Sequence, residues 1–330
     1  MGQKQLDKVL IQNKSGQNVE AIAPLIISAS RSTDLPAHHS DWFFNRLSAG
    51  YAKWVNPFNG KEQYVSFREC RLFVFWSKYP APFTNHLEEL EKRGLNYYFH
   101  FTLNDYEAEN YEPQLPPLME RIDTFVSLSE RIGPGRVLWR FDPLIISDKI
   151  DIDELLERVS RIGKTISQYT SRLTVSFLTP YQKVINRCKK RGVILDEISR
   201  EKRDVILKAI LQMSKEWNID LFTCAEENNY NEVGIPNGKC VDEQLIVKEF
   251  NGDTKLMNFL CEDTPVDLFT GYKFRSGLKD TGQRKNCNCI KSKDIGKYNT
   301  CLYDCVYCYA NSSSRMKEKM YDLHSEILGG

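Results

Sequence analysis

Short runs of β-branched and aromatic residues alternate with amphipathic stretches of helical period along the first 228 residues, and this alternation most limits the possible fold. Strands that alternate with helices pair in parallel through right-handed crossovers. The expected strands lie at residues 25–30, 72–77, 97–103, 137–141, 173–178 and 219–224.

Helices are expected between these strands, at about residues 40–49, 84–93, 116–132, 151–169 and 199–217. Ser40 is a favourable N-cap for the first helix, and Gly50 is a favourable residue to end it. Residues 51–69 resemble an inserted extended segment with a turn at Asn59 and Gly60.

Two architectures fit such a series of units, a (β/α) barrel and a doubly wound sheet. A glycine-rich nucleotide-binding motif after a strand would favour the doubly wound sheet, but no strand in this sequence is followed by such a motif. Polar residues instead follow the ends of many strands, as in a barrel. We therefore predict an α/β fold in which residues 1–228 form a partial TIM-like (β/α) barrel of about six units. An irregular cysteine-rich segment, residues 229–330, is expected to cover the barrel mouth.

Charged residues at the strand ends form the candidate site. Arg31 and Lys78 follow the first and second strands, and Glu226 follows the sixth. Arg140 and Asp142 lie two positions apart in the fourth strand, so they share one face. A buried charge has to be paired or used, and a purely structural Arg140–Asp142 pair is the alternative interpretation. The predicted mouth carries both signs of charge and suits a small zwitterionic or anionic ligand.

Five of the ten cysteines fall within residues 287–308, in the pattern C-x-C-x11-C-x3-C-x2-C. These residues are Cys287, Cys289, Cys301, Cys305 and Cys308. The N-terminus lacks the apolar core of a signal peptide, so we expect a reducing compartment and no disulfide framework. Clustered thiolates bind iron–sulfur clusters or zinc, and a zinc site formed, for example, by Cys287, Cys289, Cys305 and Cys308 is an open alternative.

The stretch TCLYDCVYCYAN, residues 300–311, resembles the cysteine signature of radical S-adenosylmethionine (SAM) enzymes. More closely, the chain resembles a bacterial family of uncharacterised proteins that carry such a radical-SAM-like cysteine cluster at the C-terminus. The segments that carry this resemblance are SASRSTDLPA, NPFNG, FWSKYPAP, YYFHFTLN, WRFDPL, TCAEE and CNCIKSKDIGKYNTCLYDCVYCYAN.

The resemblance implies a partial barrel and a [4Fe–4S] cluster held by Cys301, Cys305 and Cys308. SAM would bind the fourth iron, and a hydrogen atom would be abstracted from an unknown substrate with the help of an electron donor. An aromatic residue before the last cysteine, here Tyr307, is typical of the superfamily. In these enzymes the motif follows the first strand, so here the loop has to fold back over the mouth.

The same resemblance suggests roles for the strand-end residues. Arg31 and Lys78, together with Tyr307, are expected to bind the cofactor. The expected catalytic residues, which would position SAM or substrate, are Arg140, Asp142 and Glu226.

Cys287 and Cys289 exceed the three-cysteine pattern. Either they form a second cluster together with Cys240, or they complete the ligation of a single cluster and thereby exclude SAM.

The basic charge of the cysteine-rich segment suggests an alternative function. Residues 275–319 carry ten Lys and Arg against four Asp and Glu, although the whole chain has a net charge of only +1. The alternative is therefore a non-radical iron–sulfur or zinc module with a basic tail that binds nucleic acid. Its bases would stack on Tyr298, Tyr303, Tyr307 and Tyr309. No apolar run is long enough to span a bilayer, so we expect a cytoplasmic protein without a membrane partner.

Overall fold

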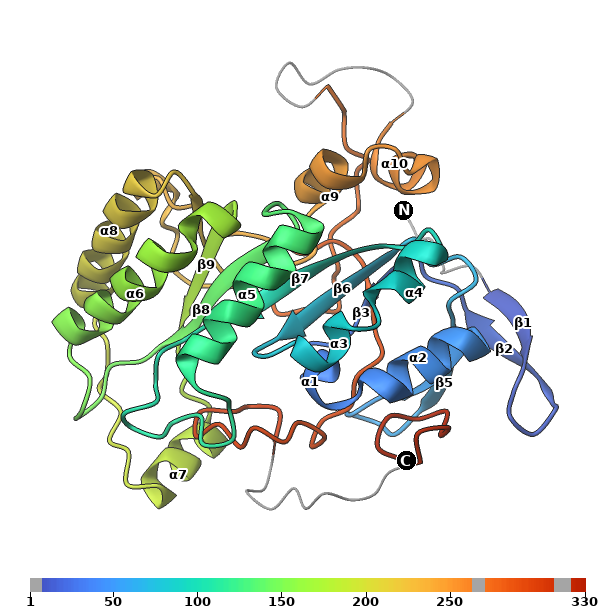
Figure 1. The fold of residues 1–330 in the computed structure, drawn as a ribbon, viewed down its shortest axis with the longest axis horizontal. Coiled ribbons are helices and arrows are strands. Elements are labelled where there is room, and N and C mark those ends of the chain that lie inside the picture. Colours follow the sequence, from blue (N-terminus) through green and yellow to red (C-terminus); the bar gives the residue numbers. More distant parts are fainter. Residues whose placement is uncertain (1–7, 263–270, 312–321) are drawn as a thin grey trace.

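A sheet of parallel strands forms the centre of the computed structural model, which describes residues 8–262, 271–311 and 322–330 (Figure 1). Its strands are β3 (Ile26–Ser28), β6 (Leu72–Ser77), β7 (Asn96–Thr102), β8 (Val137–Leu144), β9 (Arg172–Phe177), β10 (Asp220–Thr223) and β11 (Lys293–Asp294). The six expected strands are confirmed, whereas β11 was not predicted. The order is β10-β9-β8-β7-β6-β3-β11, and within the described residues β10 and β11 do not pair, so closure into a barrel is not seen.

Five helices lie where the sequence periodicity predicts them, at residues 40–49, 87–92, 118–132, 152–166 and 200–216, whereas three others within residues 8–228 were not predicted. The helices of this range are α1 (Leu35–His38), α2 (Ser40–Ala49), α3 (Ala81–Thr84), α4 (Leu87–Lys92), α5 (Leu118–Ile132), α6 (Ile152–Ile166), the 3-10 turn Ser167–Tyr169, α7 (Gln182–Lys190) and α8 (Arg200–Glu216). Gly50 ends α2 in a left-handed conformation, as expected. The prediction that Ser40 caps α2 is wrong, because α1 leads into α2 through His39 and the Ser40 hydroxyl donates to the Pro36 carbonyl at 2.7 Å.

A smaller sheet lies beside the central one. It contains β1 (Lys8–Gln12), β2 (Asn18–Ile22), β5 (Glu62–Ser66) and β4 (Tyr51–Val55), in that order. The inserted segment forms the β4–β5 hairpin with the expected turn, in which Gly60 has a φ of +69°. The β1–β2 hairpin was not predicted.

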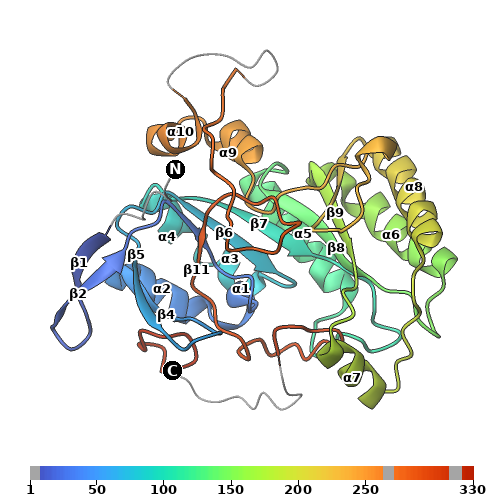
Figure 2. The ribbon, with the colours of Figure 1, turned by 180° about the vertical axis from the view of Figure 1, so that it is seen from behind.

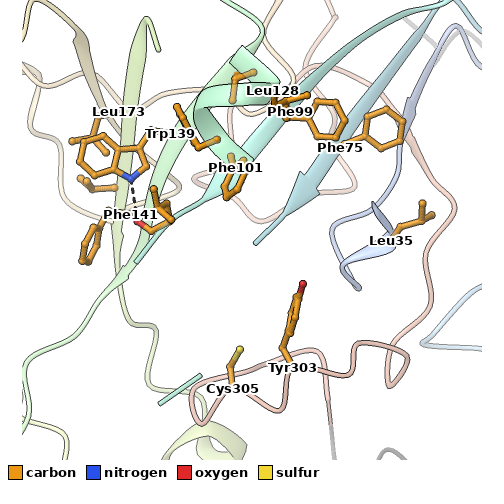
Figure 3. Packing of buried hydrophobic residues seen from close by; sticks show 14 of the residues in the cluster. Leu35, Phe75, Phe99, Phe101, Leu128, Trp139, Phe141, Leu173, Tyr303 and Cys305 are labelled. Carbon is orange, nitrogen blue, oxygen red and sulfur yellow. Dashed lines mark hydrogen bonds between the residues drawn. The ribbon is translucent and has the colours of Figure 1, made fainter. Parts of the chain in front are cut away.

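The two faces of the central sheet have different covers. Phe75, Phe99 and Trp139 point toward α2–α8 and belong to the larger apolar core (Figure 3). Val74 and Tyr98 lie on the opposite face of the sheet, in the second core. Figure 2 shows the C-terminal part of the chain crossing this second face, with α9 (Glu243–Phe250) and α10 (Thr254–Leu260) at one end.

The segment after residue 228 packs into both cores. Val241 and Ile246 belong to the second core, and Tyr303 and Leu328 belong to the larger one. Between Thr223 and α9 the chain forms only a short 3-10 turn, Asn231–Val233. The regular alternation of strands and helices therefore stops near residue 228, but the chain after it still packs into the cores of the same structure. In the described parts of the chain no helix is long and apolar enough to cross a bilayer.

Candidate functional site

The C-x3-C-x2-C motif lies in a closed loop, residues 299–311, which we call the cysteine loop. The Asn299 amide donates to the Ala310 carbonyl at 3.1 Å, so the two ends of the loop are joined. The Asn311 side chain donates to the Cys301 carbonyl at 2.7 Å, and a turn connects Cys308 to Cys305. The loop that carries the motif thus has a defined conformation.

Contacts with residues that follow the strands hold the cysteine loop in place. The His39 ring is 2.9 Å from the Thr300 carbonyl, and the Tyr309 hydroxyl donates to the Arg31 carbonyl at 2.7 Å. Both of these contacts are with the segment after β3. Farther along the loop, Asp304 pairs with Arg187 of α7, and Figure 3 shows Cys305 beyond the ends of the drawn strands. The loop therefore lies at the carboxyl ends of the parallel strands, where α/β folds commonly bind ligands.

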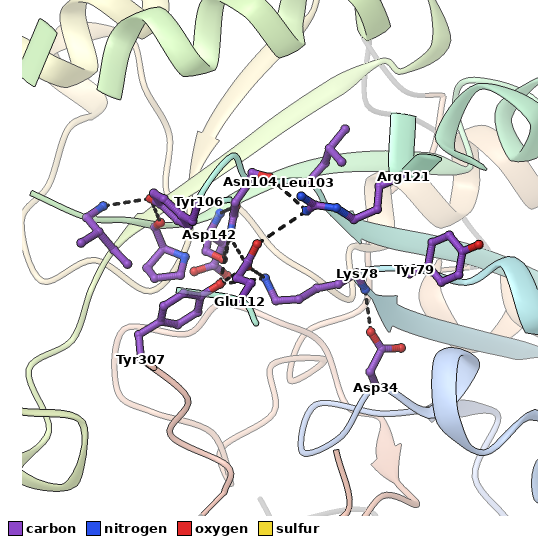
Figure 4. Close-up of polar contacts among 12 residues, drawn as sticks. Asp34, Lys78, Tyr79, Leu103, Asn104, Tyr106, Glu112, Arg121, Asp142 and Tyr307 are labelled. Carbon is purple, nitrogen blue, oxygen red and sulfur yellow. Dashed lines mark hydrogen bonds and ion pairs between the residues drawn. The ribbon is translucent and has the colours of Figure 1, made fainter. Parts of the chain in front are cut away.

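A buried polar network joins the loop to β6, β7 and α5 (Figure 4). We call it the strand-end network, and it consists of Lys78, Asn104, Glu112, Arg121 and Tyr307. Lys78 Nζ lies 2.6 Å from Glu112 Oε1 and 3.0 Å from the Tyr307 hydroxyl, which also donates to Glu112. Asn104 donates to Glu112 at 3.2 Å, and Arg121 Nη1 lies 3.5 Å from its second oxygen.

Charge pairing maintains the ionised state of this network. Burial opposes the charge of Lys78, but the Glu112 carboxylate and the nearby Cys305 raise its pKa above the ordinary value. Burial likewise opposes the charge of Glu112, and Lys78 and Arg121 outweigh it, so that its pKa is lowered. The predicted site residues Lys78 and Tyr307 therefore lie together and bond mainly to protein partners.

The three motif thiols are close enough to interact electrostatically. Cys305 is buried, and Cys301 and Cys308 are half-buried. Burial raises the pKa of Cys301 to about 12 and that of Cys305 well above its usual value. Without a cation the Cys301 and Cys305 thiols are therefore neutral at pH 7, and a bound metal would deprotonate them.

Arg140 and Asp142 form an ion pair on one face of β8, where alternation places them. Ser176 of β9 donates to the other Asp142 oxygen. Burial raises the pKa of Asp142, but Arg140 and Ser176 more than compensate, and the pKa is lowered. The Asp142 side chain is 29% exposed, so this carboxylate is accessible to a ligand, whereas Arg140 is buried.

Glu226 and Arg31 are bound to neighbouring segments. Glu226 accepts from the Phe177 amide at 2.8 Å and from Arg203 at 3.1 Å, and burial raises its pKa. The Arg31 amide donates to Asp294 at 2.8 Å. Glu226 therefore connects the end of β9 to α8, and Arg31 connects the segment after β3 to β11.

Cys287 and Cys289 contact other cysteines than those of the motif. The two thiols interact with each other, and Cys289 accepts from the Cys240 amide at 3.2 Å. The sulfur of Cys240 lies 3.7 Å from that of Cys224. All ten cysteines are free. In the part of the chain that the structure describes, no three or more His, Cys, Asp or Glu side chains are arranged so that they could hold a metal ion.

Several residues of the site carry no sequence signal. Glu112 lies in the irregular stretch between β7 and α5, where no periodicity marks it as buried, whereas Asn104 directly follows the strand expected at residues 97–103 and is a polar strand-end residue in the sequence. Cys224 and Cys240 are 16 positions apart, and no spacing motif links them in the sequence. The density of polar residues between residues 103 and 113 was the only available indication.

The stacking surface expected for nucleic acid is reduced. Tyr303 and Tyr307 are buried, so the expectation that bases stack on them is wrong. Tyr309 is 46% exposed and Tyr298 is half-buried. The basic residues Arg315, Lys317 and Lys319 lie outside the described residues.

Comparison with known proteins gives one family match. A family described as "Domain of unknown function (DUF1848)" matches residues 26–310, which include the central sheet and the cysteine loop. No curated protein matches the chain.

Proposed function

The chain belongs to the DUF1848 family, and we propose that it is an iron–sulfur enzyme of the radical-SAM type. Cys301, Cys305 and Cys308 would hold a [4Fe–4S] cluster, and SAM would occupy the iron that the protein leaves open. The open parallel sheet would serve as a partial (β/α) barrel. Its substrate would bind at the carboxyl ends of β6–β9.

The observation that carries the proposal is the position of Tyr307. This residue lies between two motif cysteines, and its hydroxyl bonds to Lys78, Glu112 and Asn104 at the strand ends. The motif follows the six predicted strands in sequence, yet it is anchored where a barrel enzyme carries its active site. A motif at this place in the sequence can serve a site at the strand ends only if its loop folds back to them.

The residues around the three thiols suit an anionic cluster. Thiolates are the usual ligands of iron–sulfur clusters, and three of them leave one iron open for another ligand. The Lys78 ammonium lies 3.0 Å from the hydroxyl of Tyr307, which stands between Cys305 and Cys308 in the sequence, so a positive charge contacts the cysteine loop. Cluster and cation would partly neutralise each other in a site of low dielectric constant.

When bound, the cluster and SAM would supply hydrogen-atom abstraction, and the chain would supply orientation. Glu112 and Arg121 would fix Lys78 and Tyr307, and through them the loop. Asp142, held by Arg140 and Ser176, is the half-exposed carboxylate that would bind an amine or hydroxyl of SAM or substrate. Glu226 and Arg31 would act as positioning residues, since the Glu226 carboxylate accepts from the Phe177 amide and the Arg31 guanidinium donates to Ser292.

Anaerobic reconstitution with iron and sulfide tests the proposal. We expect a reduced-cluster EPR signal that shifts when SAM is added, and formation of 5′-deoxyadenosine. Cys301→Ala should lose the signal, whereas Cys70→Ala should keep it, because Cys70 is buried away from the loop and bonds to the Leu72 carbonyl. A cluster that forms without any response to SAM would overturn the SAM assignment. Absence of iron from the reconstituted wild type would overturn the cluster.

A further inference from the structure

Four cysteines from three separate segments form a second thiol group, which we call the four-thiol group: Cys224, Cys240, Cys287 and Cys289. Cys224 follows β10, Cys240 precedes α9, and the other two lie just before β11. The Cys224 and Cys240 sulfurs are 3.7 Å apart, the Cys240 amide donates to the Cys289 sulfur at 3.2 Å, and Cys287 lies two positions before Cys289 in the sequence. Residues 49 positions apart, such as Cys240 and Cys289, do not meet through local structure, so the fold itself gathers these thiols.

The spacing of one sulfur pair is compatible with zinc. Zinc–sulfur bonds of about 2.3 Å in a tetrahedron put neighbouring sulfurs about 3.8 Å apart. The Cys224 and Cys240 sulfurs are 3.7 Å apart, close to that value. In a [4Fe–4S] cluster each thiolate binds a different iron, which holds the sulfurs farther apart. The observed pair therefore fits two thiolates on one metal ion better than a [4Fe–4S] cluster.

The surroundings of the four thiols suit an anionic metal centre. Arg140 Nη1 donates to the Cys240 sulfur at 3.1 Å, and the Cys240 amide donates to the Cys289 sulfur at 3.2 Å. Arg31 interacts electrostatically with Cys289, Cys240 and Cys287. Four thiolates and one divalent cation carry a net charge of −2, and two arginines beside them would compensate it. Hydrogen bonds from outer groups to ligand sulfurs are a regular feature of metal–thiolate sites.

We propose that Cys224, Cys240, Cys287 and Cys289 bind one zinc ion as a closed tetrahedral site that is structural. Four thiolates leave no open position for substrate, which distinguishes this site from a catalytic one. Binding would draw the four sulfurs from their present positions into one coordination sphere and would release their protons to solvent. The proposal does not depend on the function proposed for Cys301, Cys305 and Cys308.

The four-thiol group lies between the two edges of the central sheet, so a bound ion would connect them. Cys224 follows the edge strand β10, and Cys289 lies four residues before Lys293, at the start of the opposite edge strand β11. In the described residues no β pairing joins these two edges. A zinc ion would connect them through side chains and would hold the C-terminal segment across the second face of the sheet.

Zinc content of the full chain tests this site separately from the motif. The variant Cys301→Ala/Cys305→Ala/Cys308→Ala should retain about one equivalent of zinc per chain by mass spectrometry. The double variant Cys287→Ala/Cys289→Ala should lose it. Cys261→Ala is the matched control, because Cys261 is buried in the same apolar core as Cys240 without contacting the four thiols, and it should keep the zinc.

A measurement on the wild type avoids variants that fail to fold. Titration of the zinc-loaded protein with an organic mercurial should release the ion as about four thiols react. Replacement of zinc by Co²⁺ should give the sulfur-to-metal charge-transfer and ligand-field bands of a tetrahedral thiolate site. An iron–sulfur EPR signal in the triple variant, a Cys224–Cys240 disulfide in the folded protein, or failure to bind either ion would overturn the proposal.

Discussion

Glu112 is the residue on which the strand-end network depends, because it accepts from Lys78, Asn104 and Tyr307 and pairs with Arg121. Glu112→Gln would leave two buried cations facing a neutral amide. We expect the free energy of unfolding to fall by about 3 kcal/mol or more, since removing one partner of a buried ion pair exposes the full desolvation penalty. Urea unfolding at pH 7 measures this change.

A surface ion pair is the control for this variant. Glu88 pairs with Lys92 one turn away on α4, and both side chains are about two-thirds exposed. Glu88→Gln should cost about 0.3–0.5 kcal/mol, because water screens the pair. Equal losses for the two variants would mean that the Glu112 network adds nothing beyond a surface pair.

His39 makes stability depend on pH. Burial lowers the pKa of His39 to about 4, although its contact with Thr300 opposes the shift. The unfolded chain therefore takes up a proton near pH 6.5 that the folded chain accepts only near pH 4, so stability is complete above pH 6.5 and declines as the pH falls toward 4. The loss attributable to this residue is about 3 kcal/mol across that interval.

His39→Gln tests this dependence, because the glutamine amide can still donate to the Thr300 carbonyl but does not titrate. The slope of unfolding free energy against pH reports how many more protons the unfolded chain binds than the folded one. Between pH 6.5 and 4 we expect this number to be smaller by about one in the variant. Part of the dependence should persist, since the pKa values of His38 and His100 are also lowered. An unchanged slope would contradict a neutral, buried His39.

Individual residues were predictable only where a regular pattern controls them. The pairing of Arg140 with Asp142 follows from strand alternation and needs no further information. Glu112 was missed because its burial depends on how an irregular loop packs against Tyr307, some 195 residues away. The sequence likewise does not show which cysteines lie near Cys287 and Cys289. The contact between Cys240 and Cys289 forms only when the C-terminal segment crosses the sheet.

Among the elements, β11 joins the C-terminal segment to the sheet, and Gly296 lies directly beyond it. A Cβ atom at this position would come within 1.8 Å of the Ser30 hydroxyl oxygen and 2.4 Å of the Ser30 Cβ. Gly296→Ala should therefore push the segment away from β3 and destabilise the protein by about 1–3 kcal/mol. Hydrogen exchange should accelerate at the Ile295 amide, which donates to the Ser28 carbonyl at 3.2 Å.

Gly252→Ala is the matched control, because a Cβ atom there meets nothing within 4 Å. Its unfolding free energy should stay within about 0.5 kcal/mol of the wild type. If Gly296→Ala were equally mild, the close approach of the C-terminal segment to Ser30 would be wrong.

The predictability of the elements follows their length and period. The strands at 72–77 and the helix at 40–49 were located to the residue, because both have a clear apolar pattern. The nine-residue α7 was missed, since only Val184 and Cys188 of its side chains are buried. The two-residue β11 has no pattern of its own and exists only because it pairs with β3.

At the scale of the whole molecule, the helices and the C-terminal segment cover opposite faces of the central sheet. Ile26, Leu72 and Leu138 on the second face pack against Val241, Leu245 and Leu256. The carboxyl ends of the strands are covered by the cysteine loop, also from the C-terminal segment. Fold and candidate site therefore depend on the same last third of the chain.

A fragment of residues 1–228 should consequently fail to fold on its own. It would keep every predicted strand and helix of the alternating region but expose the apolar residues of the second face. Each buried Leu or Ile contributes about 1.5–3 kcal/mol, so the loss of this cover exceeds the net stability of a typical domain. We expect aggregation or a state that binds a hydrophobic dye and unfolds without cooperativity.

Size-exclusion chromatography, circular dichroism and dye binding, with the full chain as the control, measure the behaviour of this fragment. A soluble monomeric fragment with a cooperative transition would instead show that residues 1–228 form an independent domain, with the C-terminal segment added onto a finished core.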